Sequence, residues 1–96
     1  MALDVPLEII MYFVYVLQSK KVGIFYTGYT KDLRKRFKQH NSGEVKATKD
    51  NRPFRLIYYE ASSDKEDAVA REKYLKSGMG KRYLKNRLKH FLSLTG

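Results

Sequence analysis

The feature that most constrains the fold is an uninterrupted run of β-branched and aromatic residues from Tyr12 to Leu17, with the sequence YFVYVL. Side chains alternate between the two faces of a strand, so a run that is apolar throughout predicts a strand covered on both faces. A chain of 96 residues has room for one compact core. We therefore expect this strand to be packed on both sides within a small single domain.

The rest of the chain alternates short apolar segments with polar turns. In chain order it predicts strands over 24–29 and 54–60 and helices over 30–41, 63–77 and 81–92. The order β-β-α-β-α-α predicts an α+β domain, a three-stranded and mainly antiparallel sheet flanked by helices. We assign residues 11–93 to this domain and residues 1–10 to an N-terminal extension.

Local signals set the expected ends of the helices. Thr30 is a suitable N-cap for the first helix, and a capping box that starts at Ser63 opens the second. The segment Gly78–Gly80 is expected to end the second helix and to separate it from the last one.

Net charge restricts the class of partner. The chain carries 20 Lys and Arg against 10 Asp and Glu, a net charge of +10, and no acidic residue follows Glu72. A field of this sign attracts polyanions, so nucleic acid, anionic membranes and acidic proteins are the candidate partners. Cysteine is absent, which excludes disulfides, iron–sulfur clusters, Cys-ligated zinc and a cysteine nucleophile.

Two features argue against membrane insertion and export. The longest apolar run, from Ile9 to Leu17, is far shorter than the roughly 20 residues that a spanning helix needs. The stretch before it carries Asp4 and Glu8 where a secretory signal has a basic leader. We expect no membrane insertion and a cytoplasmic location.

Polar side chains fall where apolar ones belong in the first two helices. At about 100° per residue, His40 lies in the apolar stripe that begins at Leu33, with Arg36 beside it. In the second helix Glu72 lies about 40° from Ala68, in the middle of the stripe. A carboxylate removed from water requires a cation, a metal ion, a proton or a solvated cleft.

Two tyrosines on the first two strands complete the set. If Gln18 pairs near Gly23, Tyr15 lies opposite Tyr26 and both phenols leave the sheet on one side. Each polar residue also has a structural explanation, because tyrosines pack in sheets and His40 can bond to a carbonyl at the core edge. A structural ion pair of the arginine and glutamate is equally open. The combination on one sheet surface favours a functional site.

These residue types suit phosphodiester hydrolysis. One carboxylate together with a substrate phosphate can hold a hard divalent cation, and Glu72 is the carboxylate in the right place. Arg36 can clamp phosphate oxygens, and His40 can take a proton from a phenol or hydrogen-bond the phosphate. A tyrosine, with a pKa near 10, acts as a base at neutral pH only if nearby cations lower that value.

Two short motifs and two longer stretches carry a family resemblance. Phe13-Val14-Tyr15 and Tyr26-Thr27-Gly28 stand on the first two predicted strands, and the stretches 27–43 and 70–78 follow them. Over about residues 11–90 the chain resembles the GIY-YIG nuclease superfamily, in particular its short single-domain members and the N-terminal domain of the excision-repair nuclease. The first motif is degenerate, since it keeps the Tyr and lacks the Gly and Ile.

The resemblance implies an endonuclease that depends on one divalent ion, Mg²⁺ or Mn²⁺. It assigns water activation and phosphate orientation to Tyr15 and Tyr26, phosphate stabilisation to Arg36, proton transfer or hydrogen bonding to His40, and the metal ion to Glu72. It leaves open which tyrosine is the base, with Tyr26 favoured. We expect DNA as substrate in preference to RNA.

Other basic residues are expected to bind the flanking backbone without reading sequence. The candidates are Lys31, Arg34, Lys35, Lys46, Lys76 and Lys81. Relatives in excision repair and among homing endonucleases choose their substrate through attached domains, and a protein partner that supplies such targeting is left open here. The alternative function is a nucleic-acid-binding module with little or no catalysis. A membrane-surface role for the last helix rests on charge alone.

Overall fold

The structure, a computed structural model, describes residues 10–94, so nearly all of the extension expected at 1–10 lies outside the described residues. Within 10–94 there is one antiparallel sheet in the order β2-β1-β3. The elements are β1 (Tyr12–Ser19), β2 (Phe25–Thr30), α1 (Leu33–Ser42), a 3₁₀ turn η1 (Lys49–Asn51), β3 (Phe54–Ser62), α2 (Lys65–Lys76), α3 (Gly78–Arg87) and α4 (Lys89–Leu94). The predicted α+β class and its three-stranded sheet are confirmed.

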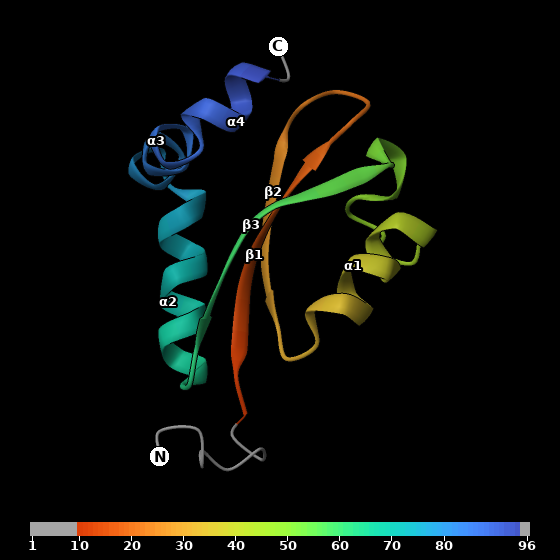
Figure 1. The fold of residues 1–96 in the computed structure, drawn as a ribbon. Coiled ribbons are helices and arrows are strands. Elements are labelled where there is room, and N and C mark those ends of the chain that lie inside the picture. The colour runs from red at the N-terminus through yellow and green to blue at the C-terminus, as the bar shows by residue number, and fades with distance from the viewer. Residues whose placement is uncertain (1–9, 95–96) are drawn as a thin grey trace, which may run out of the picture.

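The sheet lies between two helical layers, with α1 on one side and α2 followed by α3 on the other (Figure 1). The central strand β1 contacts both layers, because its side chains alternate between the faces. Val14 and Val16 pack toward Leu75 of α2, while Tyr15 and Leu17 belong to the core on the α1 side. All four β1 residues are buried, which confirms that this strand is covered on both faces.

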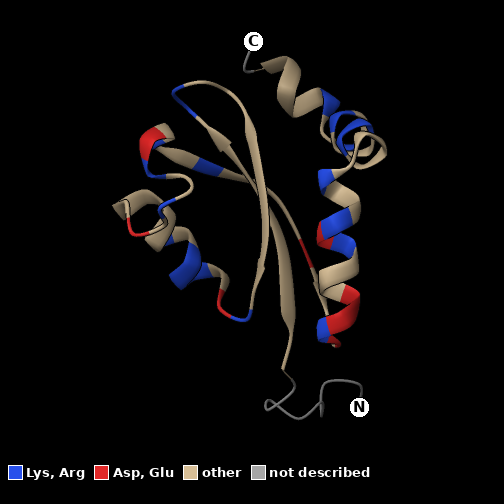
Figure 2. Cartoon of the chain, turned by 180° about the vertical axis from the view of Figure 1, so that it is seen from behind, with Lys and Arg blue, Asp and Glu red and all other residues tan. Residues whose placement is uncertain are grey.

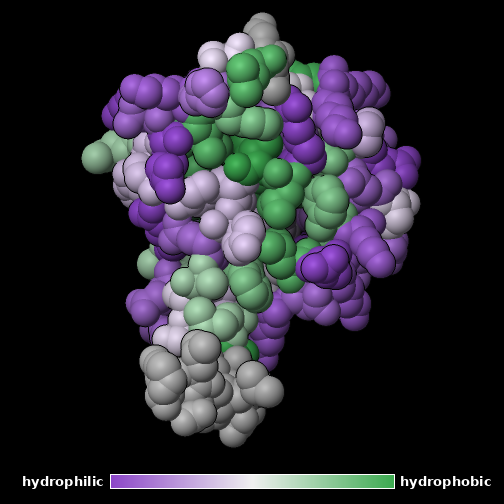
Figure 3. Space-filling model, in the orientation of Figure 1, coloured by the Kyte–Doolittle hydropathy of each residue, from purple (hydrophilic) through white to green (hydrophobic). Residues whose placement is uncertain are grey.

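The space-filling view shows how apolar and polar residues divide on one side of the molecule. Apolar residues gather in the middle of this view, between the two helical layers, and hydrophilic residues dominate the flanks (Figure 3). No helix in the described part of the chain has the length and apolar content needed to cross a membrane.

The β1–β2 hairpin forms as expected, but its register differs from the prediction. Tyr15 pairs with Gly28 and not with Tyr26. The strand continues to Ser19, whose N–H donates to the carbonyl of Ile24 over 2.9 Å, so the turn closes later and the pairing slides by two residues. Because two is the side-chain period of a strand, Tyr15 and Tyr26 still leave the same face.

The N-caps of the first two helices are also not the predicted ones. Asp32, rather than Thr30, caps α1 and accepts a hydrogen bond from the N–H of Lys35 over 3.0 Å. Asp64, rather than Ser63, caps α2. In both cases a carboxylate one or two residues further along satisfies the free N–H groups and complements the positive helix end.

The second helix ends before Gly78, as predicted, but Gly78–Gly80 form the first turn of α3 and not a break between the helices. Ser77 caps this helix by accepting from the N–H of Gly80 over 3.2 Å. A Cβ on Gly80 would collide with the carbonyl of Tyr74, so the missing side chain lets α3 start directly against α2. The helix predicted over 81–92 is instead divided at Leu88 into α3 and α4.

Candidate active site

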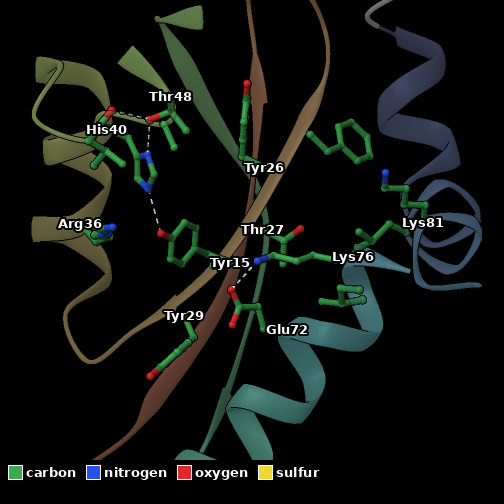
Figure 4. Close-up of a pocket in the computed structure, with 16 residues that line it drawn as sticks. Tyr15, Tyr26, Thr27, Tyr29, Arg36, His40, Thr48, Glu72, Lys76 and Lys81 are labelled. Carbon is green, nitrogen blue, oxygen red and sulfur yellow. Dashed lines mark hydrogen bonds and ion pairs between the residues drawn. The ribbon is translucent and has the colours of Figure 1, made fainter. Parts of the chain in front are cut away.

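A cleft of about 490 Å³ wraps around the edge strand β2 and is lined by side chains from both helical layers (Figure 4). Its lining includes all five residues predicted to be catalytic: Tyr15, Tyr26, Arg36, His40 and Glu72. Two of the predicted nucleic-acid-binding residues, Lys76 and Lys81, also line it. The structure therefore brings five catalytic candidates, which are up to 57 positions apart in the chain, to one cavity. The prediction that they share one sheet surface is wrong, because Glu72 comes from α2 on the opposite side of the sheet from α1, and the two groups meet only around the edge strand β2.

On the α1 side, three buried side chains form a continuous hydrogen-bonded row. The Tyr15 hydroxyl lies 2.9 Å from Nε2 of His40, and Nδ1 of His40 lies 2.9 Å from Oγ1 of Thr48. The Thr48 hydroxyl also contacts the carbonyl of Val45 at 3.4 Å, as donor. We assign the His40 proton to Nδ1, where the threonine oxygen accepts it, which leaves Nε2 to accept the phenolic proton.

Burial and one nearby cation set the protonation states of this row. Burial raises the pKa of Tyr15, and the Arg36 guanidinium offsets part of that rise. Burial lowers the pKa of His40, and the positive charge of Arg36 lowers it further. At neutral pH the phenol is therefore protonated and the imidazole is neutral, so the phenol can donate a hydrogen bond to the imidazole. The lowered pKa expected of a tyrosine base is not found at Tyr15, because burial outweighs the nearby cations.

Gly28 makes room for the Tyr15 phenol. It is the cross-strand partner of Tyr15, and a Cβ built on it would lie 2.6 Å from the phenol oxygen. A side chain at Gly28 would therefore push the ring away from His40, so this glycine is required by a close approach and not by its backbone angles.

Arg36 and Tyr26 are held by neighbours on the α1 side. Arg36 is half-buried, and its Nη1 donates to Oε1 of Gln39 over 3.1 Å. Asn51 of η1 donates from Nδ2 to the Tyr26 hydroxyl over 2.6 Å, which leaves the phenolic hydrogen free to donate into the cleft. Tyr26 packs edge-on against the ring of Phe54, and Figure 4 shows its hydroxyl pointing away from Glu72.

On the α2 side the cleft presents a single carboxylate. The side chain of Glu72 is 17% exposed, and its Oε2 lies 2.9 Å from Nζ of Lys76, one helical turn later. The ion pair between Arg36 and Glu72 that the sequence left open does not form within the described residues, where Lys76 takes that place. The two charges act on Tyr15 in opposite directions, since Glu72 raises its pKa and Lys76 lowers it.

One carboxylate can hold a divalent cation only with help from other oxygens. Among the described residues no group of three or more His, Cys, Asp or Glu side chains could hold a metal ion. Mg²⁺ commonly keeps several waters and binds through one or two carboxylates plus substrate phosphates. Glu72 fits a cation of this type, because it opens into a cleft with room for a phosphate and water.

Two hollows extend the cleft along β2. Toward α1, a hollow that shares Arg36 with the cleft adds Lys31 and Lys35. Toward α3, a hollow that shares Lys81 adds Lys85. Figure 2 shows basic residues along the helices on both sides of the sheet, whereas β2 itself carries no charged residue. We call this lysine-flanked surface the β2 groove.

The remaining predicted cations lie outside the β2 groove. Arg34 lines a neighbouring hollow together with Lys38. Lys46 is exposed in the segment that follows α1. Two further polar residues bond to the site: Thr48 contacts His40 and Asn51 contacts Tyr26. The sequence did not indicate either one, because both lie in a segment without helical or strand periodicity.

The two motifs that carried the resemblance lie side by side in the sheet, with Tyr15 of the first paired to Gly28 of the second. The family model of the GIY-YIG catalytic domain matches residues 11–91. This chain belongs to the GIY-YIG family. GIY-YIG domains are nuclease-like and act on nucleic acid, which agrees with the charge of +10.

Several proteins of similar length match most of this chain. A UPF0213 protein of Staphylococcus saprophyticus is 39% identical over 75 residues, which cover 77% of this chain and 90% of that protein. The UPF0213 protein YazA of Bacillus subtilis is 46% identical over 66 residues, or 68% of this chain and 66% of YazA. The solution structure of a UPF0213 protein from Bacillus halodurans is 40% identical, with a TM-score of 0.49, and the match covers 77% of this chain and 81% of that one.

Proposed function

We propose that this chain is an endonuclease that hydrolyses phosphodiester bonds of nucleic acid, DNA in preference to RNA, with one Mg²⁺ or Mn²⁺ ion at Glu72. The observation that carries the proposal is the meeting of the Tyr15–His40 hydrogen bond and the Glu72 carboxylate at one cleft. A hydrogen-bonded phenol and imidazole provide a route for a proton, and a lone carboxylate suits a cation that a phosphate completes.

Tyr15 and His40 move the proton of the attacking water in this proposal. His40 takes the phenolic proton at Nε2 while Thr48 keeps the proton on Nδ1 in place. The Tyr15 oxygen then accepts a proton from water, whose oxygen attacks phosphorus. The lowered pKa of His40 keeps the imidazole neutral but makes it a weaker base, and the pKa of Tyr15 is raised, so the positive charges of Arg36 and of a cation at Glu72 would have to stabilise the phenolate. The hydrogen bond to His40 is the observation that distinguishes Tyr15 from Tyr26. We therefore favour Tyr15 over Tyr26 as the base.

The phosphate is held by the remaining residues of the cleft. Arg36 offers a planar fork of N–H donors to two phosphate oxygens, and Tyr26 donates its free phenolic hydrogen to orient the group. A divalent cation on Glu72 supplies Lewis-acid stabilisation of the charge that develops on the phosphate and the leaving oxygen. Lys31, Lys35, Lys81 and Lys85 bind the flanking phosphates, so the strand to be cut follows the β2 groove.

The second candidate function is nucleic-acid binding with little or no catalysis. The observation that favours it is the Glu72–Lys76 ion pair, because a carboxylate already neutralised by an ammonium needs no metal ion. This alternative keeps the role of the β2 groove and removes the role of the Tyr15–His40 row.

A cleavage assay separates the two functions. Purified protein is incubated with supercoiled plasmid, branched DNA, single-stranded DNA and RNA, in Mg²⁺, Mn²⁺ or EDTA. We expect metal-dependent cleavage of at least one DNA substrate, its loss in Glu72→Gln, and its retention in Glu66→Gln, a matched change in the exposed first turn of α2. If wild type and Glu72→Gln cleave every substrate equally, or neither cleaves any, the nuclease proposal fails and salt-dependent binding alone is left.

A further inference from the structure

Helix α2 carries two ion pairs of different character on neighbouring residues. Arg71 donates from Nε to both carboxylate oxygens of Glu60 on β3, at 3.0 and 2.9 Å. Its guanidinium also lies over the rings of Tyr74 and Tyr83, at 5.1 and 5.0 Å from their centroids. This pair is held by several contacts, and it anchors the helix to the sheet.

The pair on the cleft side of α2 is built for exchange. Lys76 makes one contact to Glu72, at 2.9 Å, and its side chain is 56% exposed. The ammonium end of the pair is exposed and returns to water easily, so Lys76 can leave at small cost provided that another cation replaces it at Glu72. The lysine stem is long and flexible, and Nζ can reach other anions in the cleft without movement of the helix.

The carboxylate, in contrast, cannot be left without a cation. Only 17% of the Glu72 side chain is exposed, and an unpaired charge in such a place is strongly unfavourable. A divalent cation that arrives at Glu72 must displace Lys76, and the displaced ammonium then needs a new anion. The phosphate of a nucleic acid in the same cleft is the nearest group of that kind.

We propose that Lys76 is the resident counter-ion of Glu72 and is exchanged for the divalent cation when a substrate phosphate enters, so that metal and nucleic acid bind cooperatively. The inference rests on the proposed function, because it takes Glu72 as the metal-binding residue. It adds a role for Lys76 that goes beyond general attraction of the backbone. By thermodynamic linkage, nucleic acid must tighten metal binding by the same factor as metal tightens nucleic-acid binding.

The test measures Mn²⁺ affinity by electron paramagnetic resonance, which requires no turnover. Each protein is titrated with Mn²⁺ alone and in the presence of a phosphorothioate DNA 12-mer that resists cleavage. For wild type we expect weak binding of Mn²⁺ alone and binding that is about tenfold tighter with the oligonucleotide. For Lys76→Met we expect tighter binding of Mn²⁺ alone and an effect of the oligonucleotide below about threefold. Lys76→Arg, which keeps the charge, retains the coupling.

Two further variants make the outcome specific. Lys73→Met removes the same charge from the same helix at an exposed position outside the β2 groove, so it should keep the wild-type coupling. Glu72→Gln should lose Mn²⁺ binding. If Glu72→Gln binds Mn²⁺ as wild type does, the metal site of the proposed function is wrong, and the proposed exchange of Lys76 for the cation is overturned as well. If Glu72→Gln loses Mn²⁺ but Lys76→Met keeps the wild-type coupling, only the exchange is overturned.

Discussion

The two sides of the cleft are built differently. On the α1 side, Tyr15, His40 and Thr48 are all buried and joined by hydrogen bonds of 2.9 Å. On the α2 side, Glu72 is held by one contact to an exposed lysine. Proton transfer depends on fixed geometry and tolerates burial, whereas binding of ions requires groups that can change partners. We infer that the α1 side is assembled before substrate arrives and that the α2 side is completed by substrate.

The largest effect should come from removing the proton route on the buried side. Tyr15→Phe deletes the hydroxyl that meets His40 and keeps the ring that fills the core, so the fold is retained. We expect a loss of about 10²–10⁴-fold in the single-turnover cleavage rate. Tyr59→Phe is the matched control, since Tyr59 is 53% exposed and lies outside the cleft. A Tyr15→Phe protein that cleaves at the wild-type rate would assign the base elsewhere.

A glycine substitution can disrupt the Tyr15–His40 hydrogen bond on the α1 side without changing a reactive group. Gly28→Ala places a Cβ against the Tyr15 phenol and moves it from His40, while metal binding at Glu72 stays unchanged. We expect a loss of about 10–10²-fold in cleavage rate, since the base is displaced but present. Mn²⁺ affinity, measured in parallel, should match wild type. A drop in both quantities together would show that the two halves are not separable.

The role of the β2 groove can be tested by the salt dependence of nucleic-acid binding. The double variants Lys31→Ala/Lys35→Ala and Lys81→Ala/Lys85→Ala each remove two cations from one end of the β2 groove. Each should reduce the slope of log K against log salt by about 1.4–1.8, measured by fluorescence anisotropy in EDTA. Lys65→Ala/Lys73→Ala, at exposed positions on α2 outside the groove, should leave the slope unchanged. An effect at only one end would rule out a path along β2.

The smallest effect concerns pH. The pKa of His40 is lowered by burial and by Arg36, so the unfolded chain takes up a proton at His40 more readily than the folded chain does. The contribution of His40 to the free energy of unfolding is fully present above about pH 6.5. It is lost as pH falls from there toward the lowered pKa of the folded state. Denaturant unfolding at several pH values should show this slope in wild type and in His90→Gln. The part of the slope of unfolding free energy against pH that comes from His40 should vanish in His40→Gln. An unchanged slope in that variant would contradict the lowered pKa of His40.

The sequence predicted those features that depend on local periodicity. The apolar run of β1, the glutamate in the middle of the α2 stripe and the histidine in the α1 stripe all follow from counting residues along one element. The order of elements followed as well, because each strand and helix has its own pattern. Together with the predicted pairing of the first two strands and the family resemblance, these features selected the five cleft residues.

Features that depend on contacts between elements could not be predicted in this way. The hairpin register is set by how the chain turns after Ser19, and Thr48 and Asn51 reach the site from a segment with no periodic pattern. The start of α3 at Gly78 depends on close packing against α2. The Glu72–Lys76 pair was within reach, since its i,i+4 spacing is a known signal on a helix.

The central claim is that a cation at Glu72 lies beside the buried Tyr15–His40 row, so that both halves act on one phosphodiester. Substoichiometric Mn²⁺ added to ¹⁵N-labelled protein tests this directly, because paramagnetic broadening marks the amides near the ion. We expect broadening of Thr27, Gly28 and Glu72 that disappears in Glu72→Gln. Broadening centred on the acidic first turn of α2, at Glu66 and Asp67, and unchanged in Glu72→Gln, would contradict it.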